Sequence, residues 1–193
     1  MSFLMYAMVA SCTSLRCSLR GSVSMNHTLA SQCNDLGIDF LKLDQPSNAA
    51  TMFRSAINYK NDYVAAHTNL AFSYVLLEDY DQAVPVLQNA IQLDPTSFLN
   101  HFYFGIAQAA MAKIESAAES FERAISINPF FKPAILRAGL AYLLLNETET
   151  AMELFRNVSD ESLSGAYTRA GLHYLASNNT EEAIMAIHRA LRL

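Results

Sequence analysis

The chain has 193 residues, of which 52% are hydrophobic and only 16% are charged, and its formal net charge is −5. This acidic balance argues against a nucleic-acid-binding platform, which would normally carry a basic stripe. With six glycines and no tryptophan, the chain also offers little material for a glycine-rich loop that binds phosphate.

Residues 1–29 contain no acidic residue, and the first one in the chain is Asp35. Three interpretations of this leader remain open. The segment "VASC", which ends at Cys12, resembles the lipobox of bacterial lipoproteins, in which the cysteine is acylated and becomes the mature N-terminus. Against this, the apolar run before it is short, and no lysine or arginine precedes it. The composition, rich in serine and arginine, also suits an organellar transit peptide, and the third interpretation is a disordered tail.

The three cysteines, Cys12, Cys17 and Cys33, form no CxxC pair and no cluster with histidine at the spacing of metal ligands. We therefore expect neither a bound metal nor another cofactor. The longest apolar runs, at 3–10 and 141–145, are far shorter than the ~18 residues that a membrane-spanning helix requires. No transmembrane span is expected.

From residue 30 onward, the chain repeats one pattern with a period of thirty-four residues. The phrase "YDQAVPVLQNAIQLDP" at 80–95 returns as "IESAAESFERAISINP" at 114–129. Each unit has a small residue at its eighth position, alanine at its twentieth and a large apolar residue at its twenty-fourth. We count five units, which span 30–63, 64–97, 98–131, 132–163 and 164–193.

These positions predict two packed helices in each unit. A small residue at position 8 lets one helix approach another closely. Positions 20, 24 and 27 have the i, i+4, i+7 spacing of one stripe on a second helix. Proline at position 32, which is Pro95 or Pro129, ends that helix. Pro85 is expected inside the first turn of the second helix, where its missing N–H has no helical partner.

This pattern resembles the tetratricopeptide repeat (TPR), a helix–turn–helix unit of about thirty-four residues. The resemblance covers 30–193 and departs from the family at position 4, where an aromatic residue or leucine is usual. It implies an all-α, right-handed α-solenoid of about five TPR units, with ten antiparallel helices and no strand. The residues at position 4 are Cys33, His67, His101, Ile135 and Tyr167.

His67 and His101 occupy the same position on neighbouring first helices, which raises the question of a metal or acid–base site. No carboxylate or thiol accompanies them at ligand spacing, so we interpret both as packing residues. The sequence contains no GxSxG motif, and no Ser/His/Asp or Cys/His arrangement can be assembled from it. An enzyme is therefore not expected.

In the TPR family, positions 2, 5, 6, 9, 12 and 13 of the first helices line a concave groove that receives peptides or helices. Mapped onto this chain, these positions give an apolar, aromatic groove flanked by two arginines. Family members that clamp the C-terminal carboxylate of a chaperone use lysine, asparagine and arginine, and only Asn69 matches here, so a clamp is not expected. Of the adjacent Phe102 and Tyr103, at least one should be exposed. The partner-binding residues that we predict are Phe72, Phe102, Tyr103, Ile106, Arg137, Leu140 and Arg169.

The resemblance implies a non-enzymatic scaffold that holds a protein or peptide partner in this groove. The alternative is an accessory or regulatory subunit packed permanently on an enzyme complex. Short TPR lipoproteins similar to this chain serve in the assembly of pili and secretion systems of the type IV or Tad type. An acylated Cys12 would then place the chain at the outer membrane, facing the periplasm, and an unmodified Cys12 would leave it in the cytoplasm.

The C-terminal helix carries Ile184, Ile187 and Leu191 on one stripe. Part of this stripe should pack within its own repeat, and the rest would face water. Because an uncovered apolar face at the end of a repeat array is unfavourable, we expect self-association or partner contact through this helix.

Overall fold

The computed structural model describes residues 23–156 and 164–191, and Cys12 lies outside this range. The described residues form ten helices and no strand, which confirms the predicted all-α solenoid. The helices are α2 (Val23–Lys42), α3 (Pro46–Tyr59), α4 (Val64–Leu76), α5 (Tyr80–Leu93), α6 (Phe98–Ala110), α7 (Ile114–Ile127), α8 (Lys132–Leu144), α9 (Thr148–Arg156), α10 (Ser164–Ala176) and α11 (Thr180–Ala190).

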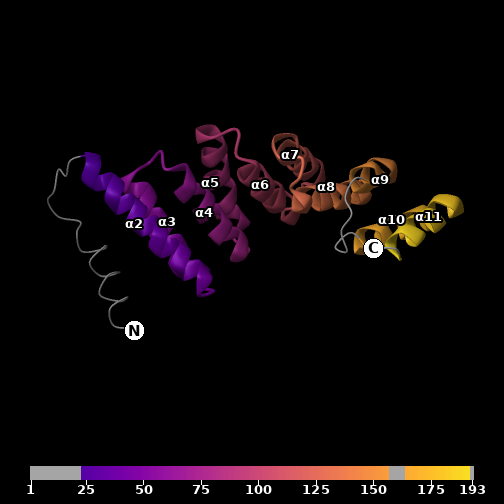
Figure 1. The fold of residues 1–193 in the computed structure, drawn as a ribbon, viewed down its shortest axis with the longest axis horizontal. Coiled ribbons are helices and arrows are strands. Elements are labelled where there is room, and N and C mark those ends of the chain that lie inside the picture. The colour runs from indigo at the N-terminus through magenta and orange to yellow at the C-terminus, as the bar shows by residue number, and fades with distance from the viewer. Residues whose placement is uncertain (1–22, 157–163, 192–193) are drawn as a thin grey trace.

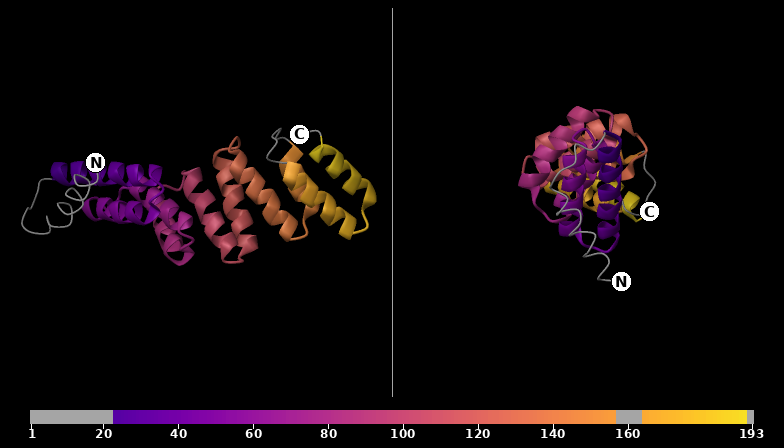
Figure 2. Two further views of the ribbon diagram at one scale, coloured as in Figure 1. Left: turned by 90° about the horizontal axis from the view of Figure 1, so that it is seen from below. Right: turned by 90° about the vertical axis from the view of Figure 1, so that its left-hand side faces the viewer.

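The helices follow one another along an elongated array, so that the two ends of the described chain lie at opposite ends of the molecule (Figure 1). Each helix packs mainly against the helices before and after it in sequence, and consecutive first helices such as α4 and α6 also touch. Figure 2 shows the same succession from below, with the helix pairs side by side along the long axis. Packing is therefore local in sequence, as in other repeat arrays. None of the helices in the described part of the chain combines the length and apolar character that crossing a membrane requires.

Alanines build the interior of each repeat. Positions 20 and 27 of the units are occupied by alanine wherever the structure describes them, and these side chains are buried. Methyl groups at these positions let the two helices of a repeat approach closely, while the larger residue at position 24 fills the remaining space. The fully buried alanines of this set include Ala49, Ala56, Ala83, Ala90, Ala117, Ala124, Ala151 and Ala183.

Three glycines at position 8 face phenylalanine rings at position 24, and the fourth, Gly171, faces Ile187. A Cβ atom added to Gly105 would lie 2.6 Å from Cε1 of Phe121, and one added to Gly37 would lie 2.5 Å from Cε1 of Phe53. The second repeat pairs Ala71 with a smaller leucine instead. Where position 24 is phenylalanine, position 8 is thus glycine, because the two residues share one space between the helices.

The turn inside every repeat contains one residue in the left-handed conformation. In the third repeat the N–H of Ala112 donates to the carbonyl of Ala109 at 3.0 Å, and the N–H of Lys113 donates to that of Gln108 at 2.9 Å. This pair of bonds is the Schellman motif that ends a helix. No glycine is used at this position, although a non-glycine residue there costs about 1 kcal/mol. The five left-handed residues, with φ between 56° and 63°, are Asp44, Glu78, Ala112, Asn146 and Asn178.

Pro85 lies deeper in its helix than we predicted. Helix α5 begins at Tyr80, and its hydrogen-bond ladder starts where Ala83 N–H donates to the carbonyl of the N-cap residue Asp79 at 3.0 Å. Pro85 is therefore past the first turn, and the carbonyl of Asp81 lacks the partner that an N–H at position 85 would supply. Both residues are exposed, so water can satisfy that carbonyl.

The first helix of the first repeat begins before residue 30, where the sequence predicted the repeat to start. Helix α2 begins at Val23, so residues 23–29, which the sequence assigned to the leader, form the first turns of this helix. The segment contains no proline or glycine that would end a helix. It also leads into Leu29, which is half-buried, and Ala30, which is buried.

Candidate functional site

Each of the two histidines at position 4 forms a hydrogen bond between its first helix and the connection that precedes it. Nε2 of His67 donates to the carbonyl of Asn61 at 2.8 Å, and Nε2 of His101 donates to the carbonyl of Pro95 at 3.0 Å. Each ring therefore bonds to the backbone six residues earlier, in the connection that precedes its helix. These bonds support the interpretation of both rings as packing residues. Within the described residues, no group of three or more His, Cys, Asp or Glu side chains could hold a metal ion.

The middle of the predicted groove is aromatic. The rings of Phe72 on α4 and Tyr103 on α6 are tilted against each other, with centroids 5.1 Å apart, and both side chains are half-buried. Burial raises the pKa of the Tyr103 hydroxyl above its ordinary value, so this group stays neutral and can donate a hydrogen bond. The two rings thus join neighbouring first helices and still present an edge at the surface.

Phe102 does not belong to an accessible binding surface, which corrects our prediction for this residue. Its side chain is only 8% exposed. Its ring centroid lies 5.0 Å from that of Phe131 and 5.9 Å from that of Phe121. Successive residues on a helix point in directions about 100° apart, so Phe102 enters the core while its neighbour Tyr103 packs half-buried against Phe72. Neither residue is exposed, contrary to our prediction for at least one of them.

The N-terminal part of the first-helix face is a chain of neutral polar groups. Nδ2 of Asn69 donates to Oδ1 of Asn34 at 3.0 Å, and the hydroxyl of Thr68 donates to Oδ1 of Asn100 at 2.7 Å. The one residue that matched the chaperone clamp, Asn69, therefore uses an amide N–H within the array. These bonds link α2, α4 and α6 to one another.

The C-terminal part of the face contains an apolar hollow between α8 and α10, with a volume of about 340 Å³. Two predicted residues meet there, Leu140 and Arg169, whereas Ile106 is half-buried against the core around α6 and α7. Leu144 and Leu172 are largely exposed at its rim. Sequence reasoning missed Leu144 and His173; for Leu144, the run "AYLLL" was the available signal. The lining residues are Leu140, Leu143, Leu144, Arg169, Leu172 and His173.

Arg169 lines this hollow, and a second arginine, Arg137, lies on the same helix as Leu140. Arg137 on α8 and Arg169 on α10 are exposed. Neither forms an ion pair in the part of the chain that the structure describes, where the salt bridge is between Lys42 and Asp39. Guanidinium groups hold carboxylates in a bidentate geometry. The hollow therefore combines apolar walls with unpaired positive charge.

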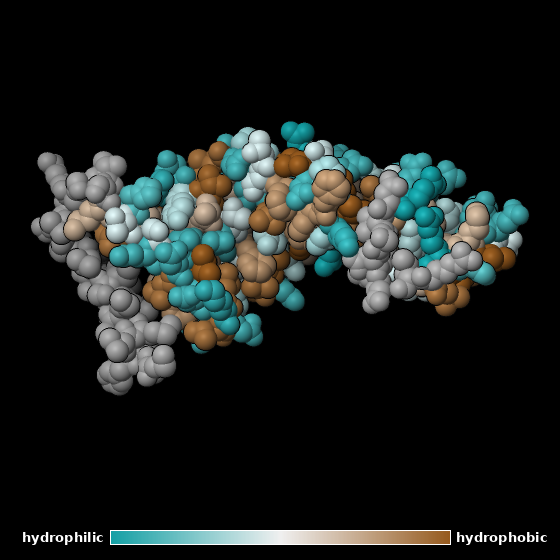
Figure 3. All heavy atoms as spheres, in the orientation of Figure 1, coloured by the Kyte–Doolittle hydropathy of each residue, from teal (hydrophilic) through white to brown (hydrophobic). Residues whose placement is uncertain are grey.

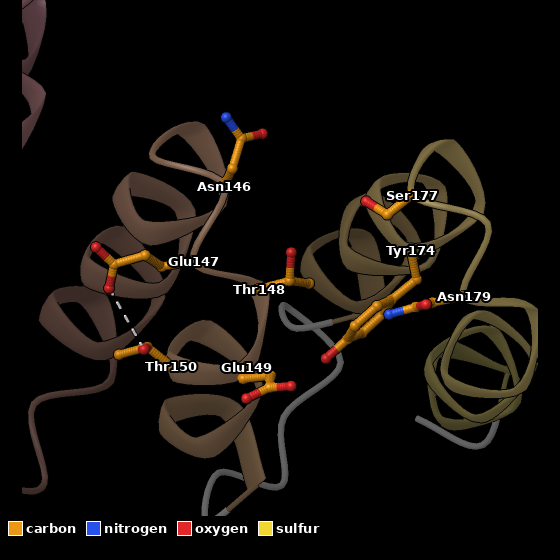
Figure 4. A pocket seen from close by; sticks show the side chains of 8 residues that line it. All are labelled: Asn146, Glu147, Thr148, Glu149, Thr150, Tyr174, Ser177 and Asn179. Carbon is orange, nitrogen blue, oxygen red and sulfur yellow. Dashed lines mark hydrogen bonds between the residues drawn. The ribbon is translucent and has the colours of Figure 1, made fainter.

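A second pocket, of about 310 Å³, lies at the turn end of the last two repeats. Figure 4 shows Tyr174 and Asn179 on one side of it and the residues around the start of α9 on the other. Its walls are polar, and Glu147 accepts a hydrogen bond from Thr150 at 3.5 Å. Because these residues belong to the turns between the helices of the last two repeats, and every repeat has such a turn, we assign this pocket no ligand.

Comparison with known proteins agrees with the repeat pattern. Residues 64–97 and 133–161 each match a model described as tetratricopeptide repeat. A curated relative is the Small glutamine-rich tetratricopeptide repeat-containing protein 2 of Saccharomyces cerevisiae, which is 30% identical over 79 residues. That match covers 41% of this chain and 23% of the relative, so the chain spans less than a quarter of the relative's length.

Solved structures share the fold along most of the array. The crystal structure of MamA superposes with a TM-score of 0.74 at 21% identity and covers 81% of this chain and 92% of its own. YrrB, described as a TPR protein with an unusual peptide-binding site, gives 0.72 at 17% identity and covers 83% and 84%. These identities establish likeness of fold. The two matched ranges therefore carry tetratricopeptide repeats, and the array as a whole shares the fold of these solved structures.

Proposed function

We propose that this chain is a non-enzymatic scaffold that holds a segment of a partner protein on the face of its first helices. TPR arrays generally act in protein interactions, and a structural neighbour is described with a peptide-binding site. The observation that carries the proposal is the apolar hollow between α8 and α10, bordered by Arg169. Concave apolar pockets with a few placed polar groups are the usual form of a binding site.

The chemistry of the hollow indicates the kind of segment that it accepts. Leucine side chains form the walls, so an apolar side chain of the partner gains free energy by leaving water there. The guanidinium groups of Arg137 and Arg169 can pair with carboxylates beside that anchor. The preferred segment therefore carries a large apolar residue close to aspartate or glutamate.

A phage-displayed library of random peptides, panned against the 193-residue chain, supplies a probe. We expect the enriched peptides to combine an apolar residue with nearby acidic residues. Binding of the best peptide is measured by fluorescence anisotropy. Leu172→Asp and Arg169→Ala should each raise its Kd by about tenfold or more, because a bound peptide would cover both side chains. Both residues are exposed, so neither substitution should change the melting temperature much.

Leu93→Asp is the matched control, because Leu93 is an exposed leucine on the second helix α5 and lies outside the hollow. This variant should bind the peptide like the wild type. Enriched peptides that bind Leu172→Asp and Arg169→Ala with unchanged affinity would place the binding surface elsewhere.

The alternative function, an accessory subunit of an enzyme complex, makes a different prediction for purification. A permanent partner would cover the hollow and co-purify at fixed stoichiometry through a high-salt wash, since apolar interfaces are not screened by salt. Affinity purification followed by mass spectrometry separates the two functions: a catalytic protein retained in this way would favour the alternative.

We also propose, from the segment "VASC" alone, that acylation at Cys12 anchors the array to the outer membrane for pilus or secretion-system assembly. Each buried methylene of an acyl chain contributes about 0.8 kcal/mol, so two or more chains hold a protein at a membrane. Membrane fractionation tests this, with wild type expected in the membrane fraction and Cys12→Ser in the soluble one. Equal solubility of both would replace the lipoprotein by a cytoplasmic scaffold.

A further inference from the structure

Helix α11 presents an apolar face to solvent at the C-terminal end of the described array. Ile184 is 59% exposed, Met185 is 62% exposed and Leu191 is 80% exposed. Figure 3 shows apolar side chains among polar ones at the C-terminal end of the array. Ile187, on the same helix, instead faces Gly171 within its own repeat.

The same positions are covered in the earlier repeats. Ile184 corresponds to Ala50 and Ala118, which are 2% and 3% exposed, and to Val84 and Met152, which are half-buried. Leu191 corresponds to isoleucines that are half-buried, at positions 57, 91 and 125. Helix α11 thus carries a face of the kind that other repeats bury.

Met185 extends this apolar face beyond the part that the next first helix covers in the earlier repeats. Its position holds Thr51, Pro85, Glu119 and Glu153 in the other units, and all four are exposed. A further TPR first helix packed in the usual way would leave this methionine in water. The surface therefore fits an occupant that lies over Ile184 and Met185 together.

The opposite end of the array cannot provide that occupant. In the internal repeats the third position of the first helix is buried, as at Ala66 and Ala134, and so is the tenth, as at Ala107. In α2 the corresponding residues are Gln32 and Asp39, both exposed. Asp39 is also paired with Lys42 at 2.8 Å. Stacking one copy head-to-tail on the next would bury this charge, which is costly.

We propose that a second copy of the chain covers this face, with α11 packed antiparallel against α11 of the partner across a two-fold axis. Such a contact uses the same patch twice and closes at the dimer. The charges favour this orientation, because α11 has Glu181 and Glu182 in its first turn, whereas Arg189 of its last turn lies over the ring of Tyr167 in the same chain. Parallel packing would set the two acidic ends together, whereas antiparallel packing keeps them apart.

The dimer does not use the groove of the first helices, so it is independent of the proposed partner binding. A contact of one helix from each copy is at the small end of specific interfaces. We therefore expect a reversible dimer with a Kd on the order of micromolar.

Sedimentation equilibrium of the 193-residue chain under reducing conditions, over a range of concentrations, tests the proposal. The wild type should fit a monomer–dimer equilibrium without larger species. Ile184→Glu and Met185→Glu should each raise the Kd by roughly tenfold or more. Phe130→Glu is the matched control, since Phe130 is 90% exposed outside α11, and it should dimerise like the wild type.

Charge substitutions at His188 test the orientation. His188→Lys should strengthen the dimer several-fold by setting a positive charge against Glu181 of the other copy, and His188→Glu should weaken it by a similar factor. A wild type that remains monomeric at all concentrations would overturn the proposal. So would open-ended polymers, or a dimer that Ile184→Glu and Met185→Glu leave unchanged.

Discussion

Replacing Gly105 by alanine is expected to lower the free energy of unfolding by about 1–3 kcal/mol, the usual cost of overpacking a core. The same substitution in an open helix normally stabilises a protein by about 1 kcal/mol. The sign reverses here because the new Cβ atom would lie 2.6 Å from Cε1 of Phe121, whose side chain is itself buried and cannot move away. Urea denaturation measures the change.

The second repeat supplies the compensating substitution, because Ala71 there faces Leu87. Phe121→Leu alone should be destabilising, and combined with Gly105→Ala it should recover much of the loss. We expect a coupling energy of about 0.5–3 kcal/mol between the two sites. Gly165→Ala is the control, since nothing lies within 4 Å of its added Cβ, and it should be neutral or stabilising. If the two substitutions changed the free energy of unfolding additively, this would contradict the idea that Gly105 and Phe121 share one space.

Truncating Phe155 to alanine should cost about 3–5 kcal/mol, as for other fully buried aromatic residues. Its side chain is 0% exposed, lies against Gly139 and meets the ring of Tyr167 edge-on, with centroids 5.6 Å apart. Tyr167 belongs to α10, so Phe155 connects the fourth repeat to the fifth. Because repeats in an array contact only their neighbours, the damage should stay at this end of the chain.

Native-state hydrogen exchange followed by mass spectrometry locates the loss. In Phe155→Ala, helices α10 and α11 should lose protection while α2 to α5 keep it. Phe53→Ala is the matched control, because Phe53 is the equally buried residue of the first repeat. In this variant, helices α2 to α5 should lose protection while α10 and α11 keep it. A uniform fall in protection over the whole array in both variants would show that the repeats unfold as one unit.

Some features of the candidate site were accessible to sequence reasoning. Leu140 and Arg169 were predicted from their positions in the first helices, and the structure brings both to the same hollow. Phe102 was predicted to bind a partner and is instead in the core. A position number gives the approximate direction of a side chain, and the residues opposite decide whether that side chain is covered.

The sequence alone determined the class of fold, because helix pairing in this chain depends on patterns that recur every thirty-four residues. Alanines at positions 20 and 27 and a large residue at position 24 specify which stripe of each second helix is buried, and the short connections allow only neighbouring repeats to meet. Tertiary structure decided what the pattern leaves open: the hollow between α8 and α10, the burial of Phe102 and the exposed face of α11. Periodicity describes each helix by itself, whereas exposure depends on how closely the next helix packs against it.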